Sequence, residues 1–169
     1  MAILASINGE VQLSMRLLSK TYDPFQKDIE WFAYELAVEG RRPPDSPGAG
    51  VEGAVGYAAR GQINRKDLNA LLSGLDELTA GNGAMRFEPY DLNFYFEWSH
   101  ETPLVYLIVT WFDLALSPRR FEQRFPSAHA GFRFLADHEA LLGFRQAVGD
   151  ESLAAAVEPE QPKSSTLLQ

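Results

Sequence analysis

The sequence contains no cysteine, which excludes disulfide bonds, thiolate nucleophiles and zinc sites built on cysteine. It also lacks an excess of basic residues, because 15 Lys and Arg stand against 23 Asp and Glu. Binding to nucleic acid needs clustered Lys and Arg, so the charge argues against a nucleic-acid-binding protein and favours a basic protein partner. No run of about 18 apolar residues is present, and the N-terminus lacks the features of a signal peptide. We therefore expect a soluble, cytoplasmic protein with no membrane partner.

What the sequence does contain is enough apolar side chain for one core. A chain of 169 residues with 46% hydrophobic residues predicts a single domain. The richest stretch is residues 87–112, whose first half alternates apolar and polar residues as a half-buried strand does. The second half, residues 104–112, is apolar at nearly every position and predicts a central strand covered on both sides. The residues expected on the buried face of the first half are Leu92, Phe94, Phe96 and Trp98.

Other strands flank recognisable turn signals. Asn8-Gly9 between two alternating runs is a strong hairpin signal, so two strands are expected to open the domain. Residues 31–38 predict a third strand, and residues 51–59 a hairpin partner for it. Residues 41–50, which are rich in Pro and Gly, predict a flexible surface loop between them. Residues 132–136 predict a short last strand.

Two helices are expected to pack on the sheet, at about residues 65–80 and 138–148. Asn64 is in position to cap the first helix, with Asp67 three residues later, and Gly81 is in position to end it. Asp137 is in position to cap the second, which Gly149 is expected to end. The sequence thus predicts one α+β domain over residues 1–149, mainly an antiparallel sheet with two helices, and a weakly ordered polar tail over residues 150–169.

Motifs for catalysis or cofactor binding are weak. Residues 48–53 have the letters G-x-G-x-x-G, but they follow a Pro-rich loop and precede a strand, the opposite of a dinucleotide-binding context. No two histidines have a metal-ligand spacing, and no nucleophile elbow is present. We therefore predict no catalytic, cofactor-binding or metal-binding residue and expect a protein that is not an enzyme. One alternative stays open, a small enzyme or ligand-binding domain whose pocket uses His100, Glu101 and Arg120.

The segment from Arg119 to Arg124 is unusually basic for so acidic a chain. Its arginines have two interpretations, phosphate binding or ion pairing within the protein. Phe121 and Phe125 favour a third, in which the phenylalanines pack and the arginines stay solvated.

Acidic residues crowd two of the expected strands. If those strands are neighbours, their outward carboxylates form one negative surface that suits docking of a basic protein, and charge reversal at Glu30, Glu35 and Glu97 would slow association. The alternative is ordinary solvation and protection of sheet edges. The candidate partner-binding residues are Asp28, Glu30, Glu35, Glu88, Asp91, Glu97 and Glu101.

Several short phrases resemble the WapI-type bacterial immunity proteins. They are the acidic-Trp opening of the third strand at residues 28–32, Glu88-Pro89 before the strand at residues 92–94, and residues 132–134 leading through Asp137 into a helix. The resemblance covers about residues 10–148, without the Pro-rich loop or the Arg119–Arg124 segment. It implies a small α+β protein that neutralises a toxin domain by binding it, and it supplies no catalytic residues. A structural, self-associating module is a further alternative, and the sequence does not indicate the oligomeric state.

Overall fold

The computed structural model describes residues 1–26, 28–40, 55–91, 93–113 and 129–158, and these form two antiparallel four-stranded sheets and two helices. The first sheet has the order β1 (Ala2–Ala5), β2 (Val11–Tyr22), β3 (Glu30–Gly40) and β4 (Val55–Asn64). The second has the order β5 (Ala84–Phe87), β6 (Phe94–Thr102), β7 (Val105–Asp113) and β8 (His129–Asp137). The helices are α1 (Arg65–Thr79) and α2 (His138–Ala154). The predicted α+β domain with two helices is confirmed.

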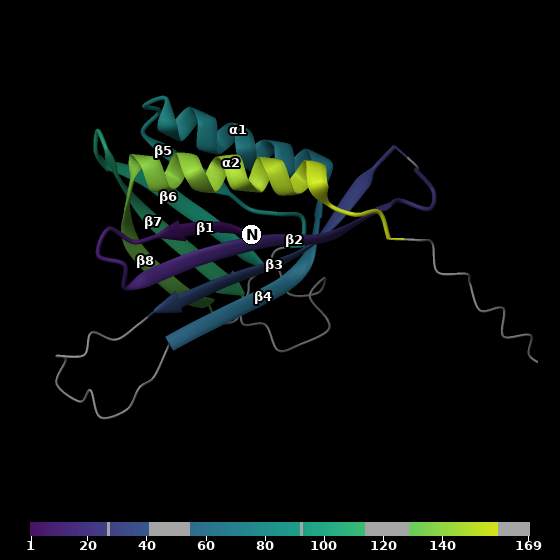
Figure 1. Cartoon of the computed structure of the whole chain (residues 1–169), viewed down its shortest axis with the longest axis horizontal. Coiled ribbons are helices and arrows are strands. Elements are labelled where there is room, and N and C mark those ends of the chain that lie inside the picture. Colours follow the sequence, from purple (N-terminus) through teal and green to yellow (C-terminus); the bar gives the residue numbers. More distant parts are fainter. Residues whose placement is uncertain (27, 41–54, 92, 114–128, 159–169) are drawn as a thin grey trace, which may run out of the picture.

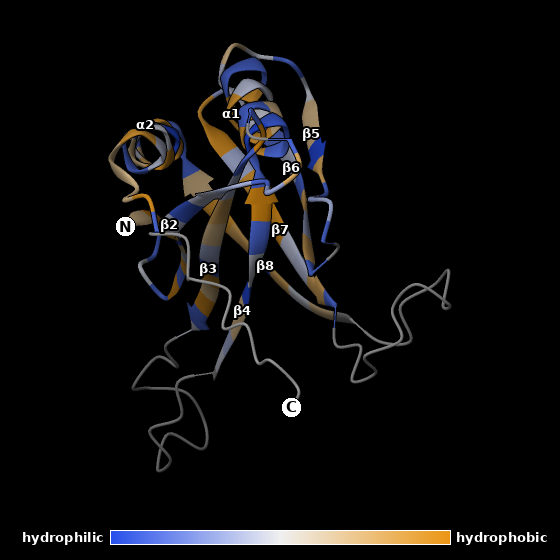
Figure 2. Ribbon diagram, turned by 90° about the vertical axis from the view of Figure 1, so that its right-hand side faces the viewer, coloured by the Kyte–Doolittle hydropathy of each residue, from blue (hydrophilic) through white to orange (hydrophobic). Residues whose placement is uncertain are grey.

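The two sheets lie one in front of the other, and both helices run along the same side of them (Figure 1). Figure 2 shows the helices lying next to each other above the space between the sheets. Helix α2 packs mainly against β1, whereas α1 packs against β5 and against α2. The buried side chains of both sheets and both helices form one hydrophobic core, which therefore belongs to a single folding unit.

The N-terminal half follows local signals closely. Gly9 has a φ of 71°, the left-handed conformation that the Asn-Gly turn between β1 and β2 requires. Strand β3 pairs with β2 on one side and with β4 on the other, as the predicted hairpin partner should. The side chain of Asn64 accepts a hydrogen bond from the Asp67 N–H at 2.8 Å and so caps α1, while Gly81, with a φ of 102°, follows its end.

Residues 105–112 lie in the predicted central strand, because β7 pairs with both β6 and β8, but the two faces of this strand are not equally buried. Burial alternates along β7, and only its inner side chains lie in the core. The outer ones, including Leu107, Val109 and Trp111, are half-buried. No described helix packs on that outer face, where Tyr95 stacks on Trp111 within the sheet.

The second helix is longer than predicted, because it continues through Gly149 to Ala154. Its last turn buries Ser152 at 3% exposure, so tertiary contacts extend the helix past a residue with low helix propensity. Beyond the helix, Lys20 donates its N–H to the Ala156 carbonyl and accepts from the Glu158 N–H, both at 2.9 Å. Residues 150–158 of the expected tail are thus part of the fold.

Several predictions fall outside the described residues. They concern the Pro-rich loop at 41–50, the G-x-G-x-x-G letters at 48–53, the Arg119–Arg124 segment, Leu92, and residues 159–169 of the tail. Neither α1 nor α2 is long and apolar enough to cross a membrane, and these are the helices of the described residues.

Candidate partner-binding surface

The histidines that had suggested a pocket hold the ends of the helices in place. The His100 ring Nε2 lies 2.7 Å from the Leu78 carbonyl in the last turn of α1. The Tyr106 hydroxyl lies 2.7 Å from Nδ1 of His138, the first residue of α2. Burial raises the pKa of Tyr106, which keeps this hydroxyl protonated. Both imidazoles described in full are therefore bound to the framework.

The proposed pocket residues do not converge in the described structure. Glu101 is exposed at the turn between β6 and β7, and Arg120 lies outside the described residues. Among the hydrogen bonds of the described residues, none joins His100 to Glu101. The described residues also contain no group of three or more His, Asp or Glu side chains placed to hold a metal ion.

The predicted acidic residues do not share one face, because the strands that carry them belong to different sheets. Strand β3, with Glu30 and Glu35, lies in the first sheet, and β6, with Glu97, lies in the second. Glu35 is bound by Arg60, its cross-strand neighbour on β4. Glu97 accepts from the Trp111 indole at 3.1 Å on the outer face of the second sheet, where Arg86 lies 3.6 Å away. The assumed strand adjacency is therefore wrong.

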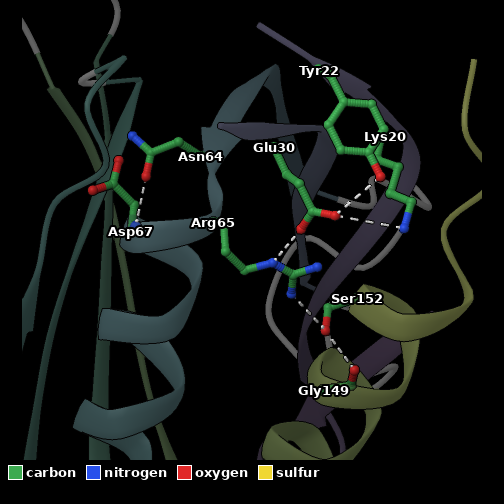
Figure 3. A network of polar contacts seen from close by, with 8 residues as sticks. All are labelled: Lys20, Tyr22, Glu30, Asn64, Arg65, Asp67, Gly149 and Ser152. Atoms are coloured by element: carbon green, nitrogen blue, oxygen red, sulfur yellow. Dashed lines mark hydrogen bonds and ion pairs between the residues drawn. The ribbon is translucent and has the colours of Figure 1, made fainter. Parts of the chain in front are cut away.

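Glu30 lies at the centre of a network that joins both helices to the first sheet (Figure 3). Its carboxylate accepts a hydrogen bond from Arg65 Nε at 2.6 Å, and Lys20 Nζ lies 3.8 Å away. The same Arg65 guanidinium reaches Ser152 on α2 at 3.4 Å and lies over the Phe32 ring. The hydrogen bond from Arg65 holds the pKa of Glu30 below 4.5, against the opposing effect of partial burial. Glu30 therefore has a structural role, because its carboxylate is bound within the protein.

The Glu30 pair predicts a pH dependence of stability. Because the pKa is lowered in the folded protein, the stabilisation is fully present above pH 4.5 and is lost as the pH falls through the folded-state value. We expect Glu30→Gln to cost about 1 kcal/mol of unfolding free energy near pH 7, since the pair is partly exposed. Urea titrations of both proteins should show the difference shrinking below pH 4.5. The exposed Glu77→Gln is the control, and a difference for Glu30→Gln that is independent of pH would contradict this assignment.

Asp91 has a structural role as well. Its Oδ2 accepts hydrogen bonds from the Tyr34 hydroxyl at 2.9 Å, from the Gln62 N–H at 3.1 Å and from Asn93 Nδ2 at 2.7 Å. Tyr34 and Gln62 belong to the first sheet, whereas Asp91 and Asn93 lie in the connection between β5 and β6 of the second sheet. This carboxylate therefore links the two sheets.

The remaining predicted residues differ in position. Glu101 lies near the end of β6, just before the turn into β7. Asp28 and Glu88 are exposed, and each lies within three residues in the sequence of an aromatic residue, Trp31 and Tyr90 respectively. The Trp31 and Tyr90 rings meet edge to face, with centroids 6.2 Å apart. We call this region the hairpin-end surface. It consists of Phe25, Asp28, Trp31, Glu88 and Tyr90.

The aromatic residues of this surface are unusually exposed. Phe25, in the connection between β2 and β3, is 94% exposed and Tyr90 is 70% exposed. Figure 1 shows the β2–β3 hairpin extending beyond the ends of the helices. No role was predicted for these two aromatic residues. The sequence does contain a signal, because Phe25 lies in an acidic, Pro-containing turn and Tyr90 lies between Pro89 and Asp91. Exposed aromatic residues of this kind are characteristic of protein interfaces.

The backbone holds these side chains in position. Asp23 Oδ1 accepts hydrogen bonds from the N–H groups of Phe25 at 2.8 Å and Gln26 at 2.9 Å. The Gln26 bond is the largest cause of the lowered pKa of Asp23, so its carboxylate stays ionised. On the other side, the Tyr90 N–H donates to Asp67 Oδ2 at 3.0 Å, which ties its loop to the first turn of α1.

The chain matches no protein-family model, and no curated protein and no solved structure is significantly similar to it.

Proposed function

We propose that this chain is a non-catalytic immunity protein that neutralises a bacterial toxin domain by binding it directly in the cytoplasm. The proposal starts from the short sequence phrases that resemble WapI-type immunity proteins and from the net charge of −8. A toxin domain that acts on nucleic acid is itself often basic, so an acidic binding protein suits it electrostatically.

The observation that carries the proposal is the contrast between polar and aromatic side chains. The described groups best suited to acid–base chemistry, His100, His138, Glu30 and Asp91, are all engaged in contacts that hold the framework together. The large aromatic side chains at the hairpin end are instead exposed. The polar groups thus stabilise the fold, whereas the exposed aromatic side chains are available for contact with another protein. This contrast favours a binding protein over an enzyme.

Co-expression with the toxin domain encoded beside its gene tests this function. The expected result is that cells expressing the toxin domain grow only when this chain is also expressed. The purified chain should also form a stable complex with an inactivated toxin domain, measured by light scattering after gel filtration. The absence of a neighbouring toxin gene, or the absence of both protection and a complex, would refute the proposal. A chain that forms only complexes with itself would support the structural module instead.

A further inference from the structure

The apolar part of the hairpin-end surface has the composition of an interface anchor. Trp31 is fixed on β3, where it pairs with Thr21 and Asn64, and its ring packs against that of Tyr90. Tyr90 buries little of its own surface in this contact, since it remains 70% exposed. Trp and Tyr contribute most among residues at protein interfaces, because they bury a large area while losing few rotatable bonds.

Hydrogen bonds join the described residues on both sides of the hairpin tip. Asp23 donates its N–H to the Ile29 carbonyl, and Ile29 donates to the Gln26 carbonyl, both at 2.9 Å. Together with the bonds that Asp23 accepts, these contacts fix the backbone that carries Phe25. A partner that contacts Phe25 finds its backbone already held, so less binding free energy is lost to conformational entropy there.

The charges around the aromatic side chains determine which partner fits. Arg65 and Lys20, two cations near this surface, both pair with Glu30. Asp28 and Glu88 are exposed, and no ion pair of the described residues includes either of them. Among the described residues of this surface and the adjoining first turn of α1, these two carboxylates stand against one exposed cation, Lys66; Lys27 lies outside the described residues. This charge distribution complements a surface rich in Lys and Arg, whose side chains also stack favourably on Trp and Tyr rings.

We infer that the hairpin-end surface is the docking site for a folded partner protein with a basic face, with Trp31 and Tyr90 as its apolar anchor. The inference rests on the proposed function and adds the position of the interface and the chemistry of the partner. It replaces the single acidic face expected from the sequence. Glu30, Glu35 and Glu97 have no part in it, since each is bound within the protein.

The test uses the full chain and the inactivated toxin domain encoded beside its gene. Phe25→Ala and Tyr90→Ala remove exposed aromatic side chains and should leave the fold unchanged. Tyr90→Ala is expected to weaken binding at least about tenfold, mainly through faster dissociation, as loss of an anchor does. The pair Asp28→Lys with Glu88→Lys is expected to slow association about tenfold at low salt, with a much smaller effect in 0.5 M salt. Surface plasmon resonance at two salt concentrations measures both rates.

Matched changes elsewhere on the molecule serve as controls. Leu135→Ala removes a side chain that is 41% exposed on the outer face of the second sheet. The pair Glu39→Lys with Glu77→Lys reverses two exposed charges, one near the far end of β3 and one near the end of α1. Neither control should change the affinity more than about twofold, since uninvolved surface residues contribute little.

The outcomes separate this inference from the proposed function. If the wild-type chain binds and Tyr90→Ala leaves the affinity unchanged, the interface lies elsewhere and the docking site is refuted, while the proposed function stands. If charge reversal leaves the association rate unchanged, the basic partner face is refuted. If the wild-type chain does not bind the toxin domain, the proposed function fails and the docking site with it. A self-association of the free chain that Tyr90→Ala abolishes would assign the surface to a second copy and overturn the inference.

Discussion

Replacing Gly61 with alanine is expected to lower the free energy of unfolding by about 2–4 kcal/mol, because a methyl group at this position overlaps the polar link between the sheets. A β-carbon on Gly61 would lie 2.5 Å from Asn93 Nδ2 and 2.8 Å from the Tyr34 hydroxyl, and Asp91 Oδ2 would also be in its way. Distances under 3.0 Å are essentially never seen for β-carbons. The side chains of Asp91, Asn93 and Tyr34, or the backbone that carries them, therefore have to move.

The cost arises because displacement leaves several polar groups without their partners. Tyr34 is fully buried, and its hydroxyl donates to Asp91. The Gln62 N–H depends on the same carboxylate, and Asn93 also reaches the Arg60 carbonyl at 3.4 Å. A buried hydroxyl that loses its acceptor costs more than the hydrogen bond contributed when formed. Steric strain and the loss of these hydrogen bonds therefore both lower the free energy of unfolding of Gly61→Ala.

Urea unfolding of the wild-type protein and of Gly61→Ala measures this effect. Gly83→Ala is the matched control, since a β-carbon there meets no atom within 4 Å. We expect the control to stay within about 0.5 kcal/mol of wild type. Equal stabilities of Gly61→Ala and Gly83→Ala would show that the link between the sheets bends to admit the methyl group.

Where the fold was predicted correctly, the information was local. The Asn8-Gly9 turn needs only residues with access to left-handed conformations, and the cap of α1 needs only Asn64 and an N–H three residues later. Alternation identified Phe96 and Trp98 as core residues, because the two faces of a strand follow directly from its geometry. Such signals do not depend on the rest of the chain.

Where prediction failed, the deciding contacts join distant parts of the chain. The division of eight strands into two sheets depends on pairings that periodicity does not specify. Gly149 was expected to end α2, yet burial of Ser152 and its contact with Arg65 extend the helix. Lys20 likewise pairs with residues 156–158, which composition alone assigns to a tail.

The candidate site was predicted only in part, for a related reason. A cluster of Asp and Glu residues in the sequence does not show which carboxylates form ion pairs or hydrogen bonds within the folded protein. Asp91 and Tyr34 are 57 residues apart in the chain, and Glu30 and Arg65 are 35 apart, so neither contact is visible in the sequence. Of the seven predicted residues, Asp28 and Glu88 belong to the hairpin-end surface. The exposed rings of Phe25 and Tyr90 were missed because an aromatic residue in a sequence is normally assigned to the core.

Replacing Trp98 with alanine is expected to destabilise the protein by about 3–5 kcal/mol, the usual cost of removing a large aromatic side chain from a core. Trp98 is fully buried on β6, with its ring centroid 4.7 Å from that of Phe96 and 5.9 Å from that of Phe144 on α2. Its removal therefore takes away contacts within the second sheet and between that sheet and α2.

Trp98→Phe is expected to cost distinctly less, about 1–2 kcal/mol. The buried indole N–H of Trp98 has no hydrogen-bond partner among the described residues, so phenylalanine removes an unsatisfied donor while keeping most of the apolar contact. Trp111→Phe provides a matched comparison, since that indole is half-buried on the outer face and donates to Glu97. Urea unfolding gives the three free energies, and near-ultraviolet circular dichroism reports whether the core keeps fixed packing. If Trp98→Phe is as unstable as Trp98→Ala, the indole N–H contributes to stability, which would contradict its assignment as an unsatisfied donor.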